Sequence, residues 1–507
     1  MWILDSLKMR KNDQTPAIVT RTGSYTFAEV WKNSECLARD IEATGGKTPV
    51  VLYGDKHPMM IPTMMAALKS GRAYVPVDIS YPPERLRQIA AEVDACVIYN
   101  YSDVELDLPF LIRNKKEIAE LCRETCEEDI PESHWVKDED DCYILFTSGS
   151  TGKPKGVPIT KANILNLLTF DYFYTEGLTQ CVLCQYSFSF DPSGILIYFY
   201  LSLGKTLICV DKALFKDPPE MVEWMAKNKI SYWISTPSVI ELCRKCSFFN
   251  GETLPELKVF NFGGEILTKS MVEFLHEAFP GVPVYNLYGP TEATIQVVGC
   301  EITDEMMADE NPLPIGYMMS EADYLIDSEN NEMPHDENNP GEFIIISKSV
   351  SNGYYNDPEK TAKVFFRAED GRMAYRTGDL VYEKNGLLYF AGRKDFQVKL
   401  SGYRIEIEDV VNNLVKIPFV QDSTVLPVYD AGGKVKCLVA FVSIRPDHPE
   451  KNKMKNTIEI KKQLRTLVPS YMVPQKILFL DEFPLNVNGK IDRKALAKML
   501  EKQERTE

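Results

Sequence analysis

Residues 143–156 read YILFTSGSTGKPKG, an apolar run that leads directly into a loop of glycines, hydroxyl residues and lysines. The composition of residues 143–146 is typical of a buried strand. Glycines let backbone amides approach an anion closely, serines and threonines add hydroxyl donors, and Lys153 and Lys155 add positive charge. The stretch therefore predicts a strand followed by a loop that binds a polyphosphate.

This loop differs from a Walker P-loop, which needs a glycine five residues before the Gly of Gly-Lys-Ser/Thr. Gly152-Lys153 is followed by Pro154, and Thr147 occupies the position of that first glycine. The Gly-Lys-Thr triplets at 46–48 and 204–206 lack it as well. The pattern disfavours a P-loop nucleotide hydrolase and leaves a flexible Ser/Gly surface loop as the structural alternative.

Around the loop, short β-rich runs alternate with amphipathic stretches, as in 49–54, 57–71 and 73–78. This rhythm predicts a layered α/β domain with a largely parallel sheet. Residues 313–395 change to shorter strands broken by Asn, Gly and Asp, which predicts a small β-rich subdomain.

After Asp395 follows a compact segment with helix candidates at 406–416 and 457–468 and strand candidates at 423–429 and 437–444. A separate α+β domain of this size is reasonable. We therefore predict an N-terminal domain over 1–394 and a small C-terminal domain over 395–507.

Composition limits the class of protein. The 507 residues carry a formal net charge of −16, which disfavours nucleic acid as a general partner. The N-terminus lacks the apolar run of a secretory signal, and the most apolar segment, 194–203, is too short to span a bilayer. We expect a cytoplasmic protein, monomeric and without membrane insertion.

Two Cys-x-x-Cys pairs leave open a zinc site. They are Cys181 with Cys184, and Cys243 with Cys246. Their separation is long and both lie in apolar or helical sequence, so packing in the core is the favoured interpretation. The five histidines form no metal-ligand spacing.

Four further motifs follow the loop: YGPTE at 288–292, YRTGDL at 375–380, GRKDFQVKLSGYRIE at 392–406 and PLNVNGKIDRKAL at 484–496. With TSGSTGKPKG, they resemble in sequence order the motifs of the adenylate-forming enzymes, which include acyl-CoA synthetases, luciferases and peptide-synthetase adenylation domains. The resemblance covers nearly the whole chain. It implies ATP and Mg²⁺ as cofactors, and a mobile C-terminal lid that turns about Asp395.

The same resemblance implies roles for individual residues. Tyr288 would stack on adenine, Thr291 would contact the α-phosphate, and Glu292 would hold Mg²⁺. Asp379 would accept hydrogen bonds from the ribose hydroxyls, and Arg393 would add a cation nearby. Lys490 would bridge the substrate carboxylate and the nucleotide. The remaining ATP-binding residues implied are Thr147, Ser148, Gly149, Ser150, Thr151, Gly152, Lys155, Asn286, Leu287, Gly289, Pro290 and Phe390.

Asp191, in FSFDPSG at 188–194, indicates which acid is activated. In the amino-acid-activating branch an Asp at this place pairs with the substrate ammonium, and a buried carboxylate needs such a cation. By the same resemblance the substrate site would be lined by Pro192, Ile195, Ser235, Asn261, Gly263, Leu287, Ile295 and Gln296.

Over the whole chain the closest resemblance is to the D-alanine–D-alanyl carrier protein ligases of Gram-positive bacteria. It implies transfer of D-alanine to the phosphopantetheine thiol of a separate carrier protein, as in lipoteichoic acid modification. Gly263 departs from that branch, which has Cys there, and Pro192 and Gln296 also differ. The alternatives are a stand-alone peptide-synthetase-type adenylation enzyme for another amino acid, an acyl-CoA ligase, and a catalytically silent nucleotide-binding protein.

Overall fold

The computed structural model describes residues 1–123, 128–149, 154–170, 180–328, 331, 333–430, 432–484 and 491–504. These residues form two compact units. The larger comprises Met1–Ile79, Ile89–Phe146 and Gly156–Asp395. The smaller comprises Phe396–Glu507 together with the short segments Ser80–Gln88 and Thr147–Lys155.

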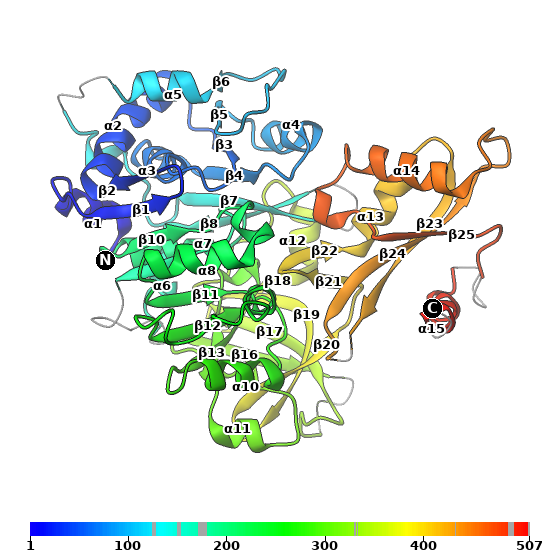
Figure 1. The fold of residues 1–507 in the computed structure, drawn as a ribbon. Helices are drawn as coiled ribbons and strands as arrows, with labels where there is room; N and C mark the ends of the chain where they lie inside the picture. Colours follow the sequence, from blue (N-terminus) through cyan, green and yellow to red (C-terminus); the bar gives the residue numbers. More distant parts are fainter. Residues whose placement is uncertain are drawn as a thin grey trace. The chain divides into compact units, whose positions relative to one another are not determined.

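The loop motif at 147–156 follows a strand of a six-stranded sheet (Figure 1). Its strand order is β6 (Ile112–Arg113), β5 (Val97–Asn100), β3 (Val50–Gly54), β4 (Tyr74–Asp78), β7 (Asp141–Thr147) and β8 (Lys155–Thr160). The pairs β3–β4, β3–β5 and β4–β7 are parallel. The predicted strand before the loop is confirmed as β7, whose residues 142–146 are buried.

A nine-stranded sheet carries six of the candidate site residues on its strands: Ser235, Asn261, Gly263, Asn286, Leu287 and Tyr288. Its order is β15 (Tyr317–Met318), β14 (Val298–Glu301), β13 (Val284–Tyr288), β12 (Val259–Gly263), β11 (Tyr232–Ser235), β9 (Cys181–Cys184), β10 (Thr206–Cys209), β1 (Pro16–Thr20) and β2 (Gly23–Thr26). The strands from β13 to β1 run parallel, and the outer strands are antiparallel. The predicted largely parallel α/β domain is confirmed.

The β-rich subdomain is an antiparallel sheet of β16 (Ala322–Asp327), β17 (Gly341–Ser347), β19 (Met373–Lys384) and β18 (Phe365–Arg367), with β20 (Leu387–Arg393) paired to β19. The helices of the larger unit are α1 (Ile3–Met9), α2 (Phe27–Ala43), α3 (Met60–Lys69), α5 (Lys115–Leu121), α6 (Lys161–Leu167), α7 (Ser193–Ile195), α8 (Pro218–Lys227), α9 (Pro237–Cys243), α10 (Lys269–Ala278), α11 (Asp304–Ala308) and α12 (Pro358–Val364). Helix α4 (Pro83–Glu92) is shared between the two units.

The smaller unit is α+β, as predicted. It contains the hairpin β21 (Gln397–Leu400) and β22 (Tyr403–Glu406), and a sheet of β23 (Val420–Tyr429), β24 (Val435–Ile444) and β25 (Lys476–Phe479). Its helices are α13 (Ile407–Leu414), α14 (Lys453–Leu464) and α15 (Arg493–Glu504).

Helix α14 begins four residues before the helix that the sequence predicts at 457–468. The Asn452 side chain accepts hydrogen bonds from the amides of Met454 and Lys455, at 2.9 and 3.1 Å, and so caps the helix start. This cap was not recognised in the sequence, because hydrophobic periodicity becomes clear only from Ile458 onward.

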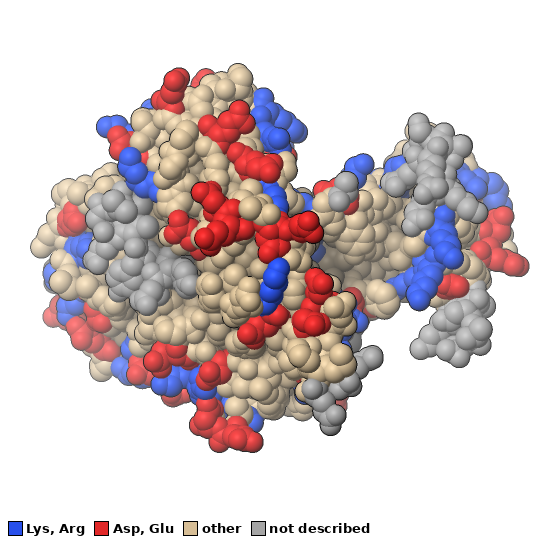
Figure 2. Space-filling model, turned by 90° about the horizontal axis from the view of Figure 1, so that it is seen from below, with Lys and Arg blue, Asp and Glu red and all other residues tan. Residues whose placement is uncertain are grey.

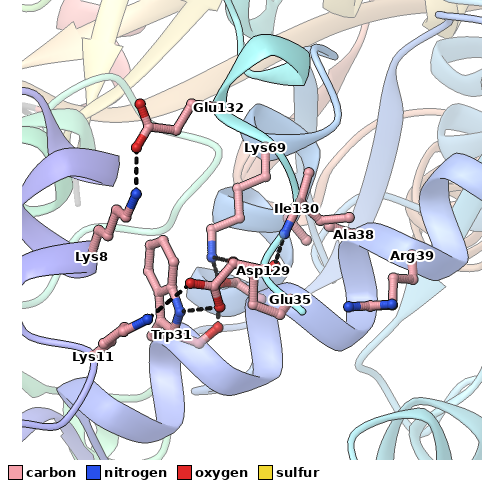
Figure 3. A network of polar contacts seen from close by, with 12 residues as sticks. Lys8, Lys11, Trp31, Glu35, Ala38, Arg39, Lys69, Asp129, Ile130 and Glu132 are labelled. Atoms are coloured by element: carbon pink, nitrogen blue, oxygen red, sulfur yellow. Dashed lines mark hydrogen bonds and ion pairs between the residues drawn. The ribbon is translucent and has the colours of Figure 1, made fainter. Parts of the chain in front are cut away.

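A polar network is buried where α2 and α3 meet (Figure 3). The Lys69 ammonium, fully shielded from solvent, forms an ion pair with Glu35 and donates to the Ser34 hydroxyl at 2.7 Å. It also lies 3.2 Å from the centre of the Trp31 ring. The second oxygen of Glu35 accepts the amide of Ile130 at 2.6 Å. Burial lowers the pKa of Lys69 to about 8, and Glu35 opposes that shift.

Candidate active site

The candidate site residues of the larger unit lie mainly at the carboxyl ends of neighbouring parallel strands. Ser235 ends β11, Gly263 ends β12 and Tyr288 ends β13. In the register Gly263 is opposite Leu287, and Asn261 is opposite Tyr285. Ligands of open α/β sheets bind at this edge, so the fold brings the residues predicted from separate motifs together.

Asp379 contacts two other predicted nucleotide-binding residues, Tyr288 and Arg393. The Tyr288 hydroxyl donates to one carboxylate oxygen of Asp379, and the Arg393 guanidinium pairs with the other. Arg393 also reaches both oxygens of Asp395 at 2.7 Å. The antiparallel pairing of β19 and β20 sets Asp379 opposite Arg393. The turn before Asp379 needs glycine, because Gly378 has φ +72° and a Cβ there would lie 2.9 Å from Arg393 Nη2.

The Asp379 carboxylate and the Tyr288 hydroxyl are both shielded from solvent. Asp379 is 5% exposed and Tyr288 is 7% exposed. Burial raises the pKa of the Tyr288 hydroxyl well above its ordinary value, and the Asp379 charge adds to that rise. Tyr288 is therefore a neutral hydrogen-bond donor at physiological pH.

Glu292 lies within the short helical turn Thr291–Ala293 that follows β13, and it is completely buried. The Tyr354 hydroxyl donates to Glu292 Oε1 at 3.0 Å, and the Ser351 amide donates to the Glu292 carbonyl at 2.9 Å. Tyr354 was not predicted, because no spacing or motif around SNGYYND connects it to Glu292. It fixes the orientation of the candidate Mg²⁺ ligand.

The fit of Glu292 to a metal depends on the other ligands. Among the residues that the structure describes, no three His, Cys, Asp or Glu side chains come together as a metal-binding group. Mg²⁺ is commonly held by one or two carboxylates together with substrate phosphates, so a single buried carboxylate fits a nucleotide-bound magnesium.

The cysteines of the two Cys-x-x-Cys pairs lie in or against the hydrophobic core, which is the interpretation that the sequence favours. Cys181 and Cys184 lie on β9, whereas Cys243 ends α9, and these thiols belong to the core that surrounds the nine-stranded sheet. Burial raises the pKa of the Cys243 thiol above its ordinary value.

Two of the predicted residues use their polar groups within the fold. The Asn286 amide donates to the Pro314 carbonyl at 2.7 Å, and the Ser235 hydroxyl donates to the Thr236 carbonyl at 2.8 Å. Both are buried. Phe390 lies on β20 and is half-buried against the main core. The polar groups of Asn286 and Ser235 therefore support the strand ends through hydrogen bonds within the fold.

The candidate amino-acid site contains two buried polar atoms without a hydrogen-bond partner in the described part of the chain. They are Asn261 Oδ1 and Gln296 Nε2. Asn261 donates through its other amide atom to the Tyr232 hydroxyl. At Gly263 a Cβ would lie 3.2 Å from the Leu287 carbonyl oxygen. A buried polar atom without a partner is costly, so this part of the site suits a ligand that carries hydrogen-bonding groups.

The segment after Glu292 has a strained backbone. Thr294 and Ile295 have φ of +57° and +77°, which is unusual for β-branched residues. The Thr294 hydroxyl donates to the Ser349 carbonyl at 2.5 Å, which holds this conformation. As a result the end of the Ile295 side chain lies against Gly194, at 2.7 Å from where a Cβ would be.

We expect Gly194→Ala to raise the KM for the amino acid about 10-fold, because the new methyl displaces Ile295. The KM for ATP should stay within twofold. Steady-state kinetics in both substrates measures this, with Gly23→Ala, where a Cβ meets nothing within 4 Å, as the matched control. Adding Ile295→Val to Gly194→Ala should restore activity. Equal effects of the two alanine variants would contradict the assignment of Ile295 to the site.

Asp191 lies in the loop between β9 and α7 and is half-buried. Its charge adds to burial in raising the pKa of the Tyr143 and Tyr186 hydroxyls. The Asp191 carboxylate therefore lies in an environment of buried aromatic residues that stay protonated. Pro192 is half-buried, and Ile195, in the following helical turn, is fully buried.

The phosphate loop belongs to the smaller unit, and the structure describes only part of it. Ser148 Oγ donates to the Arg404 carbonyl at 3.1 Å and accepts the Glu406 amide at 2.9 Å. Lys155 Nζ lies 3.8 Å from Glu406 Oε1. The Ser148 hydroxyl is therefore hydrogen-bonded to two backbone groups of β22. Ser150, Thr151, Gly152 and Lys490 lie outside the described residues.

The sequence of this chain matches two family models and a group of bacterial relatives. The family model described as AMP-binding enzyme matches residues 7–355, and that of the AMP-binding enzyme C-terminal domain matches residues 406–490. A Bacillus velezensis protein named D-alanine--D-alanyl carrier protein ligase is 37% identical over 98% of this chain and 99% of its own length. A Listeria monocytogenes protein of the same name is 38% identical over 89% of each chain.

Solved structures agree on the fold. The adenylation domain AlmE of Vibrio cholerae, solved with glycyl-adenosine-5'-phosphate, has a TM-score of 0.79 and 23% identity, covering 99% of this chain and 97% of that one. A nonribosomal peptide synthetase protein with adenylation and PCP domains has a TM-score of 0.81 at 23% identity, covering 98% and 84%. The chain belongs to the AMP-binding enzyme family and is a homologue of the bacterial D-alanine–D-alanyl carrier protein ligases.

Proposed function

We propose that this enzyme activates D-alanine with ATP and transfers it to the phosphopantetheine thiol of a separate carrier protein. Relatives named for that reaction are 37% identical to this chain over 96–98% of its length, and this similarity supports the proposal. The observation that carries the amino-acid part is Asp191, a half-buried carboxylate among aromatic side chains, which suits an ammonium partner.

The reaction has two steps. First, a carboxylate oxygen of the amino acid attacks the α-phosphorus of ATP, the bond to the β-phosphate oxygen breaks, and diphosphate leaves. Second, the carrier sulfur attacks the acyl carbon, its proton is lost, and AMP leaves with the bonding electrons. Both steps depend on positioning and charge neutralisation.

Residues of this chain are assigned to these tasks. Asp191 binds the ammonium, and Glu292, oriented by Tyr354, would hold Mg²⁺ when it is bound. Asp379 and Arg393 hold the ribose end of the nucleotide, and Lys490 neutralises charge at the carboxylate and α-phosphate. Mg²⁺, when bound, neutralises the phosphate oxygens and diphosphate.

The distribution of charge supports an anionic partner for the C-terminal segment. Residues 396–507 contain 19 Lys and Arg against 14 Asp and Glu, a formal charge of +5, whereas residues 1–395 contain 38 against 59, a charge of −21. Figure 2 shows a group of acidic side chains near the middle of one face, with basic side chains interspersed over the rest of it. A basic segment in an acidic chain attracts a carrier whose prosthetic arm bears a phosphate.

No helix within the described ranges combines the length and the hydrophobicity that crossing a bilayer requires. We propose a monomeric, cytoplasmic enzyme, in line with its use of ATP.

A second candidate function is adenylation of another amino acid for a peptide-synthetase-type pathway. The partnerless polar atoms of Asn261 and Gln296 favour it, because the methyl group of alanine forms no hydrogen bond with them. The side chain of such a substrate would carry both a donor and an acceptor.

Carrier loading tests the proposal. The enzyme, ATP, Mg²⁺ and radiolabelled D-alanine are incubated with a phosphopantetheinylated D-alanyl carrier protein, with the carrier lacking the arm, or with coenzyme A. We expect hydroxylamine-labile label on the phosphopantetheinylated carrier alone. Label on coenzyme A would support an acyl-CoA ligase instead, and faster loading by a polar amino acid would support the second candidate.

A further inference from the structure

The loop that carries Asp191 is attached to the larger unit at two points. The buried Lys56 ammonium donates to the Gln185 carbonyl at 2.6 Å, at the start of the loop. Two residues later, the Ser187 hydroxyl donates to Asp78 Oδ2 at 2.7 Å. Asp78 is the last residue of β4 in the six-stranded sheet, whereas the loop begins where β9 of the nine-stranded sheet ends. The loop is therefore fixed to both sheets.

Asp78 is held in turn by a cation. Its other oxygen, Oδ1, accepts a hydrogen bond from Lys212 Nζ at 2.5 Å. The Asp78 side chain is 3% exposed and that of Lys212 is 38% exposed. A buried carboxylate is stable only with such partners, and a hydrogen bond to a charged group is stronger than one between neutral groups. The Lys212–Asp78–Ser187 series is thus a strong attachment point.

Consecutive turns connect Ser187 to Asp191. The Phe190 amide donates to the Ser187 carbonyl at 2.9 Å, and the Ser193 hydroxyl donates to the Phe190 carbonyl at 2.6 Å. The Gly194 amide then donates to the Asp191 carbonyl at 2.8 Å. Each turn fixes the next, so the position of Ser187 determines where the Asp191 backbone lies.

We propose that Asp78, acting through Ser187, is a positioning residue that sets the Asp191 carboxylate for the substrate ammonium. The proposal rests on the assignment of Asp191 in the proposed function. Asp78 itself touches no substrate. Its effect is on the binding of the amino acid, and the binding of ATP does not depend on it.

Ser187→Ala removes the hydrogen bond to Asp78 with the least change in volume. We expect the KM for the amino acid to rise about 10-fold, with the KM for ATP within twofold. Ser189→Ala is the control for loss of a neighbouring hydroxyl: the Ser189 hydroxyl is hydrogen-bonded to that of Ser187 at 3.0 Å, whereas the bond from Ser187 to Asp78 remains in this variant. Ser187→Thr, which keeps the hydroxyl, should restore the KM.

A double-mutant cycle with Asp191→Asn distinguishes positioning from general structural damage. If Ser187 acts through Asp191, Ser187→Ala should change the amino-acid KM less than twofold in the Asp191→Asn background. Additive effects, or equal effects of Ser187→Ala and Ser189→Ala, would overturn the proposal. A wild-type enzyme that activates no amino acid would instead overturn the proposed function, so the two failures are distinguishable.

Discussion

Asp191→Asn is expected to lower kcat/KM for the amino acid by about 10²–10³-fold, measured as amino-acid-dependent ATP–pyrophosphate exchange. The substitution keeps the shape of the side chain and removes its charge, so the substrate ammonium loses its partner in a shielded environment. The aromatic neighbours Tyr143 and Tyr186 cannot replace that charge, because burial keeps their hydroxyls protonated.

The control for this effect is an acid that lacks the ammonium. Wild-type enzyme should prefer D-alanine strongly over propionate, and Asp191→Asn should lose most of that preference while its KM for ATP stays within twofold. An Asp191→Asn enzyme that keeps D-alanine activity within threefold of wild type would show that this carboxylate does not bind the ammonium.

Lys69→Met is expected to destabilise the larger unit by about 3–5 kcal/mol, because it leaves the Glu35 carboxylate buried without its cation. The remaining contact of Glu35, with the Ile130 amide, does not compensate for a full charge. Chemical denaturation followed by tryptophan fluorescence measures the loss, because Trp31 lies directly beside the ammonium (Figure 3).

The double variant Lys69→Met with Glu35→Leu is the matched control. Replacing both charges of a buried pair by apolar groups is often neutral or stabilising, so this variant should recover most of the lost stability. A double variant as unstable as Lys69→Met alone would indicate that the lost packing around Trp31, and not the unpaired charge, causes the defect.

Much of the architecture can be predicted from the sequence. The strand before the glycine-rich loop, the parallel strands at 49–54 and 73–78, and the β-rich region after residue 313 all appear in the structure. Apolar runs of strand length and turn residues determine these elements locally. The exact start of α14 was missed because a single capping residue, Asn452, sets it.

The candidate site was predictable only where residues belong to contiguous motifs. Asp379 and Arg393 come together because two motifs lie on paired strands. Tyr354, Ser187 and Asp78 support Glu292 and Asp191 through contacts between segments far apart in the chain. Nothing in their local sequence indicates those contacts, which follow from the packing of the sheets.

The left-handed conformation of Thr294 and Ile295 was also beyond sequence reasoning. β-Branched residues disfavour positive φ, so the sequence offers no signal for it. The conformation is held by the Ser349 carbonyl, 55 residues away in the chain. Tertiary contacts here override local preference, and the result is that Ile295 packs against Gly194.

ATP–pyrophosphate exchange by the purified wild-type enzyme, across D- and L-amino acids, β-alanine and short fatty acids, tests the central claim most directly. Lys490→Ala serves as the inactive control. The proposed function predicts exchange that depends on an amino acid, with D-alanine the strongest. Exchange stimulated by fatty acids but by no amino acid, or no exchange with any acid, would contradict it.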